Sequence, residues 1–134
     1  MSRKSARIQA LIQEVVEGNA FDPHYLGYFA CFNRQLFYDA HDVLEEMWLP
    51  QRQGPNGSFY KGLIQLAGAF VHLQKQRLSP AGALLRLARG NLSSYPGVHE
   101  GIQMREILAL IECWLGLLED GAFQSRQILD TSAG

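Results

Sequence analysis

The sequence contains no long apolar run and no excess of charge of one sign. A helix that crosses a bilayer needs about 20 consecutive apolar residues, and every apolar stretch in this chain is shorter. The chain has 12 basic and 13 acidic residues and a net charge of -1, whereas a nucleic-acid-binding domain usually carries a strongly basic face. We therefore expect neither a membrane nor a nucleic acid as a partner.

Cysteine is scarce, and the motifs of several enzyme classes are missing. Cys31 and Cys113 belong to no metal-binding or redox spacing. The basic start at residues 1–4 is followed by interspersed polar residues, so it does not read as a secretion signal. The chain has no phosphate-binding glycine loop and no Gly-x-Ser-x-Gly elbow. We expect a cytoplasmic protein with two reduced, buried thiols.

The sequence does contain helical periodicity, interrupted by short breaks. Asp22–Pro23 and Ser79–Pro80 each place a capping residue before a proline at the first helical position. The apolar spacing predicts six helices, at about residues 5–17, 23–32, 37–49, 59–76, 79–94 and 100–118. Short connections favour antiparallel neighbours. The prediction is an all-α fold, with residues 1–134 forming a single-domain bundle of five or six helices.

The segment 59–76 is apolar around most of its circumference. Its main apolar face consists of Phe59, Leu63, Leu66, Phe70 and Leu73. A helix that is apolar nearly all round is normally surrounded by others, so we expect this one to be the buried central helix. Gln65 and His72 interrupt its surface on one side, and each needs a hydrogen-bond partner if buried, because an unpaired polar group costs about 1–3 kcal/mol.

The segment 100–118 has the pattern of an outer helix. Arg105, Glu112 and Glu119 form a narrow polar stripe, and the opposite arc is broad and apolar. That arc suits packing against the core, which we favour, or a homo-oligomer interface.

The helix expected at 37–49 carries the one group of residues with candidate chemistry. Its periodicity places five side chains toward the core, namely Phe37, Ala40, Leu44, Met47 and Trp48. Asp39, Asp42 and Glu46 are expected to face away from the core. His41 and Glu45 lie at the margin, one turn apart on the same side. Partly buried acid–base pairs of this kind occur at active sites and metal sites.

We consider first that His41 and Glu45 are structural, forming a surface pair or fixing the register of neighbouring helices. A second interpretation is a divalent metal site, for example for zinc, in a metal-dependent hydrolase. A catalytic zinc ion needs three protein ligands, so His72 of the central helix would join His41 and Glu45, with Glu46 or Asp42 as the alternative third ligand. Glu46 would then be the candidate general base.

A third interpretation is a pocket for a small molecule or a protein partner. Glu45 and Gln65 would anchor polar groups of the ligand, and Trp48 would form one wall. We rank the structural interpretation first, the metal site second and the pocket third.

Two blocks of the sequence resemble a known family. Residues 32–48 read FNRQLFYDAHDVLEEMW and residues 59–67 read FYKGLIQLA. They resemble the blocks F-N-x-G-x-[YF]-[FY]-[ED]-A-H-[ED]-x-L-E-x-x-W and [FY]-x-x-G-L-I-Q-x-A of the domain of unknown function 309 family. His72 and the helix start at 80–83 continue the resemblance, which covers about residues 25–118.

The resemblance implies a small all-α bundle, and some members are labelled predicted metal-dependent hydrolases. The family's signature polar residues correspond here to His41, Glu45, Glu46, Gln65 and His72, with Trp48 beside them. The chain departs from the family pattern at Gln35 and near Gln76, where glycine is usual. Glycine accepts the left-handed conformation that ends a helix, so we expect Gln35 to strain its turn by about 1 kcal/mol or the turn to take another form.

Overall fold

The computed structural model describes residues 21–120, and this range folds mainly into α-helices. The helices are α2 (Pro23–Asn33), α3 (Phe37–Trp48), α4 (Gly57–Gln74), α5 (Leu78–Leu92) and α6 (Met104–Asp120). A short 3₁₀ helix, η1 (Leu49–Gln51), follows α3, and two short strands, β1 (Val98–His99) and β2 (Ile102–Gln103), precede α6. The all-α fold is confirmed. The helix expected at residues 5–17 lies outside the described range.

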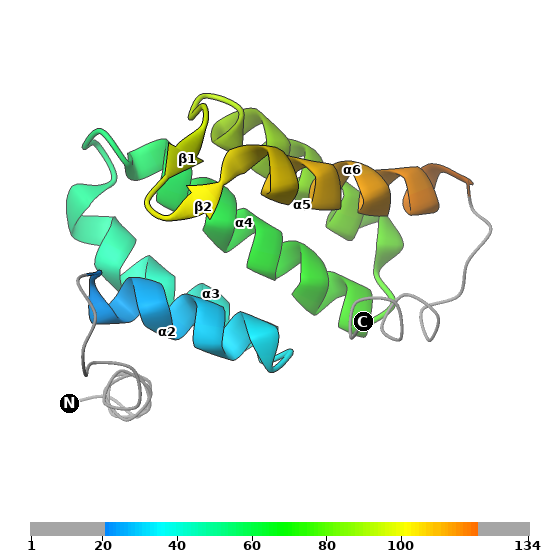
Figure 1. The fold of residues 1–134 in the computed structure, drawn as a ribbon. Helices are drawn as coiled ribbons and strands as arrows, with labels where there is room; N and C mark the ends of the chain where they lie inside the picture. Colours follow the sequence, from blue (N-terminus) through cyan, green and yellow to red (C-terminus); the bar gives the residue numbers. More distant parts are fainter. Residues whose placement is uncertain (1–20, 121–134) are drawn as a thin grey trace.

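The helices are arranged as two hairpins with α6 added to one side (Figure 1). α3 packs against both α2 and α4, and α5 packs against both α4 and α6. α4 therefore runs between the α2–α3 pair and the α5–α6 pair (Figure 1). No helix within residues 21–120 is both long enough and apolar enough to cross a membrane.

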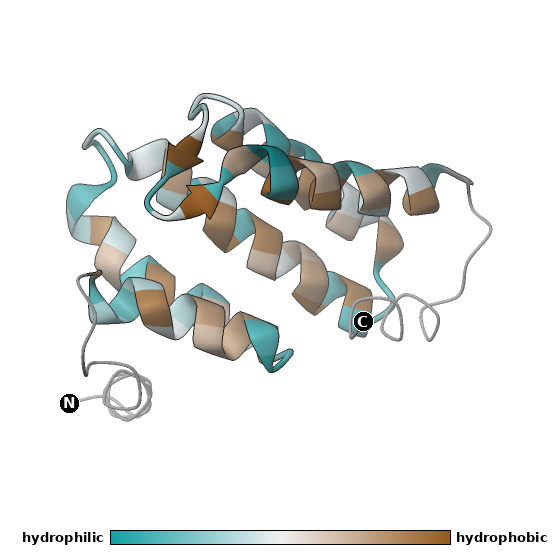
Figure 2. Cartoon of the chain, viewed as in Figure 1, coloured by the Kyte–Doolittle hydropathy of each residue, from teal (hydrophilic) through white to brown (hydrophobic). Residues whose placement is uncertain are grey.

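The expectation of a buried central helix is confirmed for α4. Phe59, Leu63, Ala67 and Leu73 are fully buried in the core, and the apolar side chains of α4 contrast with the polar connection that precedes the helix (Figure 2). α5 approaches closely at Gly62, where an added Cβ would lie 2.7 Å from Leu92. The helix begins and ends two residues earlier than predicted.

The turn after α2 and the turn after α4 share one hydrogen-bond pattern. Gln35 and Gln76 have φ angles of 61° and 60°, in the left-handed region. Gln35 N–H donates to Phe32 at 2.9 Å and Leu36 N–H donates to Cys31 at 2.9 Å, which is the paired closure of a Schellman motif. Of the two alternatives for Gln35, the left-handed turn is the one found, with glutamine in the position that favours glycine.

The start of α5 differs from the prediction. The expected cap at Ser79 is wrong: α5 begins at Leu78, its N-cap residue is Arg77, and no side chain caps it. Arg77 N–H donates to the His72 carbonyl at 2.8 Å, which closes the turn at Gln76. Because this turn reverses the chain immediately, the helix starts directly after it. The cap at Asp22 is confirmed, since its side chain accepts from His24 N–H at 2.7 Å.

A β-hairpin precedes α6, where a helix from residue 100 was expected. His99 pairs with Ile102 across a two-residue turn, and Glu100 and Gly101 have φ angles of 48° and 78°. Positive φ at both central residues defines a type I′ turn, which matches the twist of a hairpin. α6 therefore begins only at Met104.

The two cysteines have different environments. Cys31 is buried, as expected, but Cys113 is exposed, so the prediction of two buried thiols is wrong for Cys113. It follows Glu112 on the polar side of α6, and both residues are exposed.

Candidate functional site

His41 lies between two carboxylates of its own helix. Its Nε2 is 3.9 Å from Glu45 Oε2, and its Nδ1 is 3.2 Å from Asp42 Oδ1. The side chains of His41 and Glu45 are each about one-third exposed, at 31% and 32%. Asp42, by contrast, is only 5% exposed. The expectation that Asp42 faces away from the protein is therefore wrong, and its pairing with His41 is what a buried carboxylate requires.

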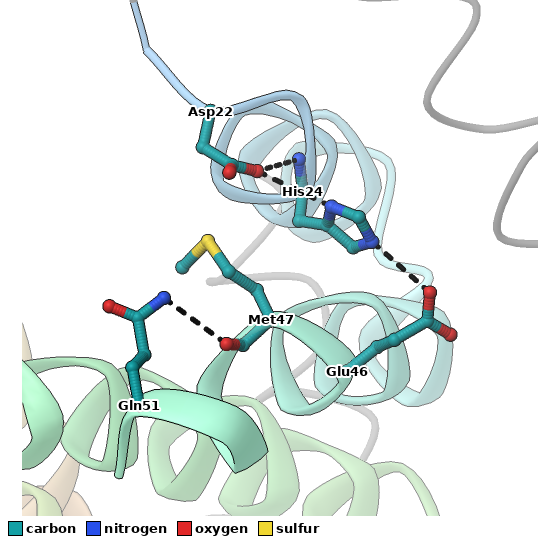
Figure 3. A network of polar contacts seen from close by, with 5 residues as sticks. All are labelled: Asp22, His24, Glu46, Met47 and Gln51. Carbon is teal, nitrogen blue, oxygen red and sulfur yellow. Dashed lines mark hydrogen bonds and ion pairs between the residues drawn. The ribbon is translucent and has the colours of Figure 1, made fainter. Parts of the chain in front are cut away.

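His24 on α2 also lies between two carboxylates, one of them on α3 (Figure 3). Its Nδ1 is 3.3 Å from the helix-capping Asp22, and its Nε2 is 3.2 Å from Glu46 Oε1 on α3. The negative charge of Asp22 also complements the positive end of the α2 dipole. Glu46 is thus directed to α2 and does not join His41, which separates the predicted general base from the predicted metal ligands.

Gln65 and His72 face α5. Asn91 Nδ2 of α5 donates to Gln65 Oε1 at 2.7 Å. Gly68 lies between Gln65 and His72 on the same side of α4, and a Cβ added there would lie 3.3 Å from Leu84 of α5. His72 follows one turn later on this side. Its Nδ1 is buried and has no hydrogen-bond partner in the described part of the chain.

α3 covers a different side of α4. Phe37 of α3 stacks on Phe70, with ring centroids 5.0 Å apart. At about 100° per residue, Phe70 lies roughly 200° around the helix from His72. His41 and Glu45 on α3 are therefore not brought together with Gln65 and His72, and the predicted site between α3 and α4 is not assembled.

The arrangement also argues against a metal ion held by α3 alone. Asp42 and Glu45 approach opposite nitrogens of one imidazole, so the two carboxylates and the ring cannot converge on one ion. Among residues 21–120, no three His, Cys, Asp or Glu side chains are grouped so that they could hold a metal.

Trp48 links α3 to α4 through a hydrogen bond. Its Nε1 donates to the Gly57 carbonyl at 2.9 Å, and its ring is partly buried against the core. The predicted pocket needs Trp48 and Gln65 to face each other. Because Trp48 bonds to the first residue of α4 and Gln65 bonds to α5, the structure does not bring them together.

The structure contains an open groove that the sequence patterns did not predict. It has a volume of about 280 Å³ and lies between α2 and α6, with Leu66 of α4 as its floor. Its other aromatic and apolar lining residues are Tyr28, Phe29, Phe32, Ile102, Ile107 and Leu110, and its polar ones are Asn33, Gln103 and Glu106. The aromatic periodicity of α2 was the available signal. It was interpreted as core alone, whereas Phe29 and Phe32 are only partly buried.

The hairpin at one end of the groove is held by a polar network. Asn56 contacts His99 Nε2 through Oδ1 at 2.7 Å and donates to Glu100 Oε1 through Nδ2 at 3.1 Å. Tyr25 OH donates to the Glu100 carbonyl at 2.6 Å. Burial, and next the nearby charge of Glu100, raise the pKa of Tyr25 and of Tyr60. The network fixes the turn that carries Ile102 and Gln103 into the groove.

These features define a small all-α domain with an apolar groove beside its central helix. Residues 25–84 match the family described as "Domain of unknown function (DUF309)". The resemblance seen in the sequence blocks is confirmed.

The chain is also similar to a curated bacterial protein. An uncharacterized protein of Aquifex aeolicus (strain VF5) is 34% identical to the chain over 91 residues. The match covers 67% of this chain but only 27% of the Aquifex protein. No solved structure matches the chain significantly.

Proposed function

We propose that this domain is a non-enzymatic protein-interaction module. The groove between α2 and α6 accepts apolar side chains of a partner polypeptide. The observation that carries the proposal is the groove itself, an open apolar surface with a polar rim. Apolar grooves between helices are one of the recurring forms of site that bind a partner polypeptide.

The size of the groove favours a polypeptide over a small molecule. Pockets for drug-sized ligands usually have volumes of about 300–1,000 Å³ and enclose most of the ligand. This groove has a volume of about 280 Å³ and is open. It can hold a few apolar side chains while the rest of a partner stays outside. Leu110 on its wall is 38% exposed and is available for such a contact.

The family's polar residues then have structural roles, which was the first-ranked interpretation of the sequence. Trp48 joins α3 to the start of α4. Gln65 joins α4 to α5 through Asn91. His41 pairs with Asp42 and Glu45 along one helix. The contacts of Trp48 and Gln65 join neighbouring helices, whereas those of His41 lie within α3.

The Aquifex relative supports an interaction role. The matched region covers 27% of that protein, so most of its length lies outside the region resembling this domain. A domain of this type therefore occurs next to further polypeptide, against which an apolar groove can pack.

The test uses a fluorescent amphipathic peptide with leucines on one helical face and glutamines on the other. We expect Leu110→Glu to weaken binding about tenfold or more, because burial of a leucine side chain contributes about 1.5–3 kcal/mol. Leu87→Glu is the matched control, since Leu87 is an exposed leucine on α5 at 54% exposure. Fluorescence anisotropy gives the affinities. Absence of peptide binding, or equal loss in both variants, contradicts the proposal.

A further inference from the structure

The walls of the groove have the spacing of helix surfaces. On α6 and the strand before it, the lining residues are Ile102, Gln103, Glu106, Ile107 and Leu110, and the last four follow an i, i+3, i+4, i+7 pattern. On the opposite side, α2 contributes Tyr28, Phe29, Phe32 and Asn33. The floor is the apolar surface of α4. Two helical walls over a helical floor form the kind of groove in which a further helix packs.

One of the residues that line the groove is charged. Glu106 is exposed and is the charged residue among those that line the groove. Asn33 and Gln103 add neutral amides, and the lining includes no lysine or arginine. A carboxylate at the edge of an apolar groove attracts a cation and repels an anion on an incoming partner.

Resting on the proposed function, we propose that the occupant is a basic amphipathic helix of a partner protein. Its apolar residues, spaced by three and four positions, enter between Phe29 and Leu110. A lysine or arginine beside this apolar row pairs with Glu106. From Met104 to Leu110, α6 rises by about 9 Å, so the contact involves about two turns of the partner helix.

A helix fits this surface better than an extended strand. An extended segment would bring unpaired backbone N–H and C=O groups onto an apolar floor, where each loses its hydrogen bonds to water. The lining offers only the side chains of Asn33, Gln103 and Glu106 as polar partners. A helix satisfies its own backbone groups and presents only side chains.

The test compares three peptides that share one leucine stripe and differ on the polar face, which is lysine, glutamine or glutamate. We expect the lysine peptide to bind the natural chain about fivefold more tightly than the glutamate peptide at low salt, the range of a surface ion pair. At about 1 M salt, where the Debye length is about 3 Å, this difference is expected to vanish.

The substitution Glu106→Lys is expected to reverse the order of the lysine and glutamate peptides. Glu119→Lys is the matched control, because Glu119 is an exposed glutamate on the same helix but does not line the groove. Glu119→Lys should leave the order of the two peptides unchanged, and this result would exclude an effect of net charge.

The outcomes separate this inference from the proposed function. Binding of all three peptides with equal affinity, still dependent on Leu110, overturns the basic partner but supports the interaction module. Absence of any peptide binding overturns both. Self-association of the chain that is lost in Leu110→Glu means that a second copy occupies the groove, which also overturns the basic partner.

Discussion

Gln35 and Gln76 occupy backbone positions that favour glycine. Both have φ near 60°, a conformation that costs a residue with a Cβ about 1 kcal/mol. We predict that Gln35→Gly and Gln76→Gly each stabilise the fold by about 0.5 kcal/mol or less, the part of this strain that remains after the greater freedom of glycine in the unfolded chain is subtracted. Urea denaturation measures the change. Gln35→Ala keeps the Cβ and should bring no gain. A loss of stability in both glycine variants would show that these turns are not strained.

His41 provides a prediction about the metal hypothesis. We expect His41→Ala to lower the free energy of unfolding by about 1 kcal/mol or less, because the imidazole is partly exposed and exposed ion pairs contribute about 0.2–1 kcal/mol. We also expect the variant to bind zinc no more weakly than the natural chain, by calorimetric titration. A zinc affinity that depends on both His41 and His72 would contradict a structural role for these residues.

The sequence predicted the positions of these side chains along the helices better than their partners. The margin position of His41 and Glu45 is confirmed by their partial exposure. The burial of Asp42 was not predicted, because helical periodicity identifies the main core face and does not tell what covers the opposite one. The separation of His72 from His41 was also not predicted, because it depends on which neighbour packs on which side of α4.

Tyr28 connects α2 to the central helix. Its hydroxyl donates to the Leu63 carbonyl at 2.6 Å, and the bond is buried. We predict that Tyr28→Phe destabilises the fold by about 1–3 kcal/mol, because it leaves a carbonyl group in the core without this donor. Tyr38→Phe is the control, since Tyr38 is 60% exposed. Chemical denaturation of the two variants gives the comparison, and equal stabilities would contradict the prediction.

The buried tyrosines also predict how stability depends on pH. Burial raises the pKa of Tyr28 well above its ordinary value of 10.0 in the folded state. The unfolded chain therefore loses this proton first. The contribution of each such tyrosine to the free energy of unfolding is fully present below pH 10. It falls by about 1.4 kcal/mol per pH unit as the pH rises above 10.

Urea denaturation between pH 9 and pH 12, with tyrosinate absorbance recorded in parallel, tests this dependence. We expect the absorbance of Tyr28 to appear only as the chain unfolds, and Tyr28→Phe to weaken the alkaline dependence. Titration of all five tyrosines in the folded chain near pH 10 would contradict it.

The helices were easier to predict from sequence than the connections between them. The apolar period and the Asp22–Pro23 cap located α2, α3 and α4 to within a few residues. The hairpin before α6 was missed because Glu100–Gly101 is not one of the strong hairpin pairs such as Asn-Gly. Its strands contain two residues each, too few for an alternating pattern. Tertiary contacts from Tyr25 and Asn56 hold the turn instead.

The groove is formed by three helices that lie far apart in the sequence, so it exists only in the folded domain. Phe29 on α2, Leu66 on α4 and Ile107 on α6 share an apolar pattern that suits a core equally well. Sequence periodicity cannot tell a covered apolar face from one left open between two helices. The fold class was therefore predictable from the sequence, whereas the candidate binding surface required the packing of α6 against α5.

The most direct measurement for the interaction role of the groove is a map of backbone amide chemical shifts during titration with the leucine–glutamine peptide. We expect shifts concentrated on α2 around Phe29 and Phe32 and on α6 around Ile107 and Leu110. Shifts centred on His41 and Glu45 of α3, or no shifts at peptide concentrations up to the millimolar range, would contradict that role.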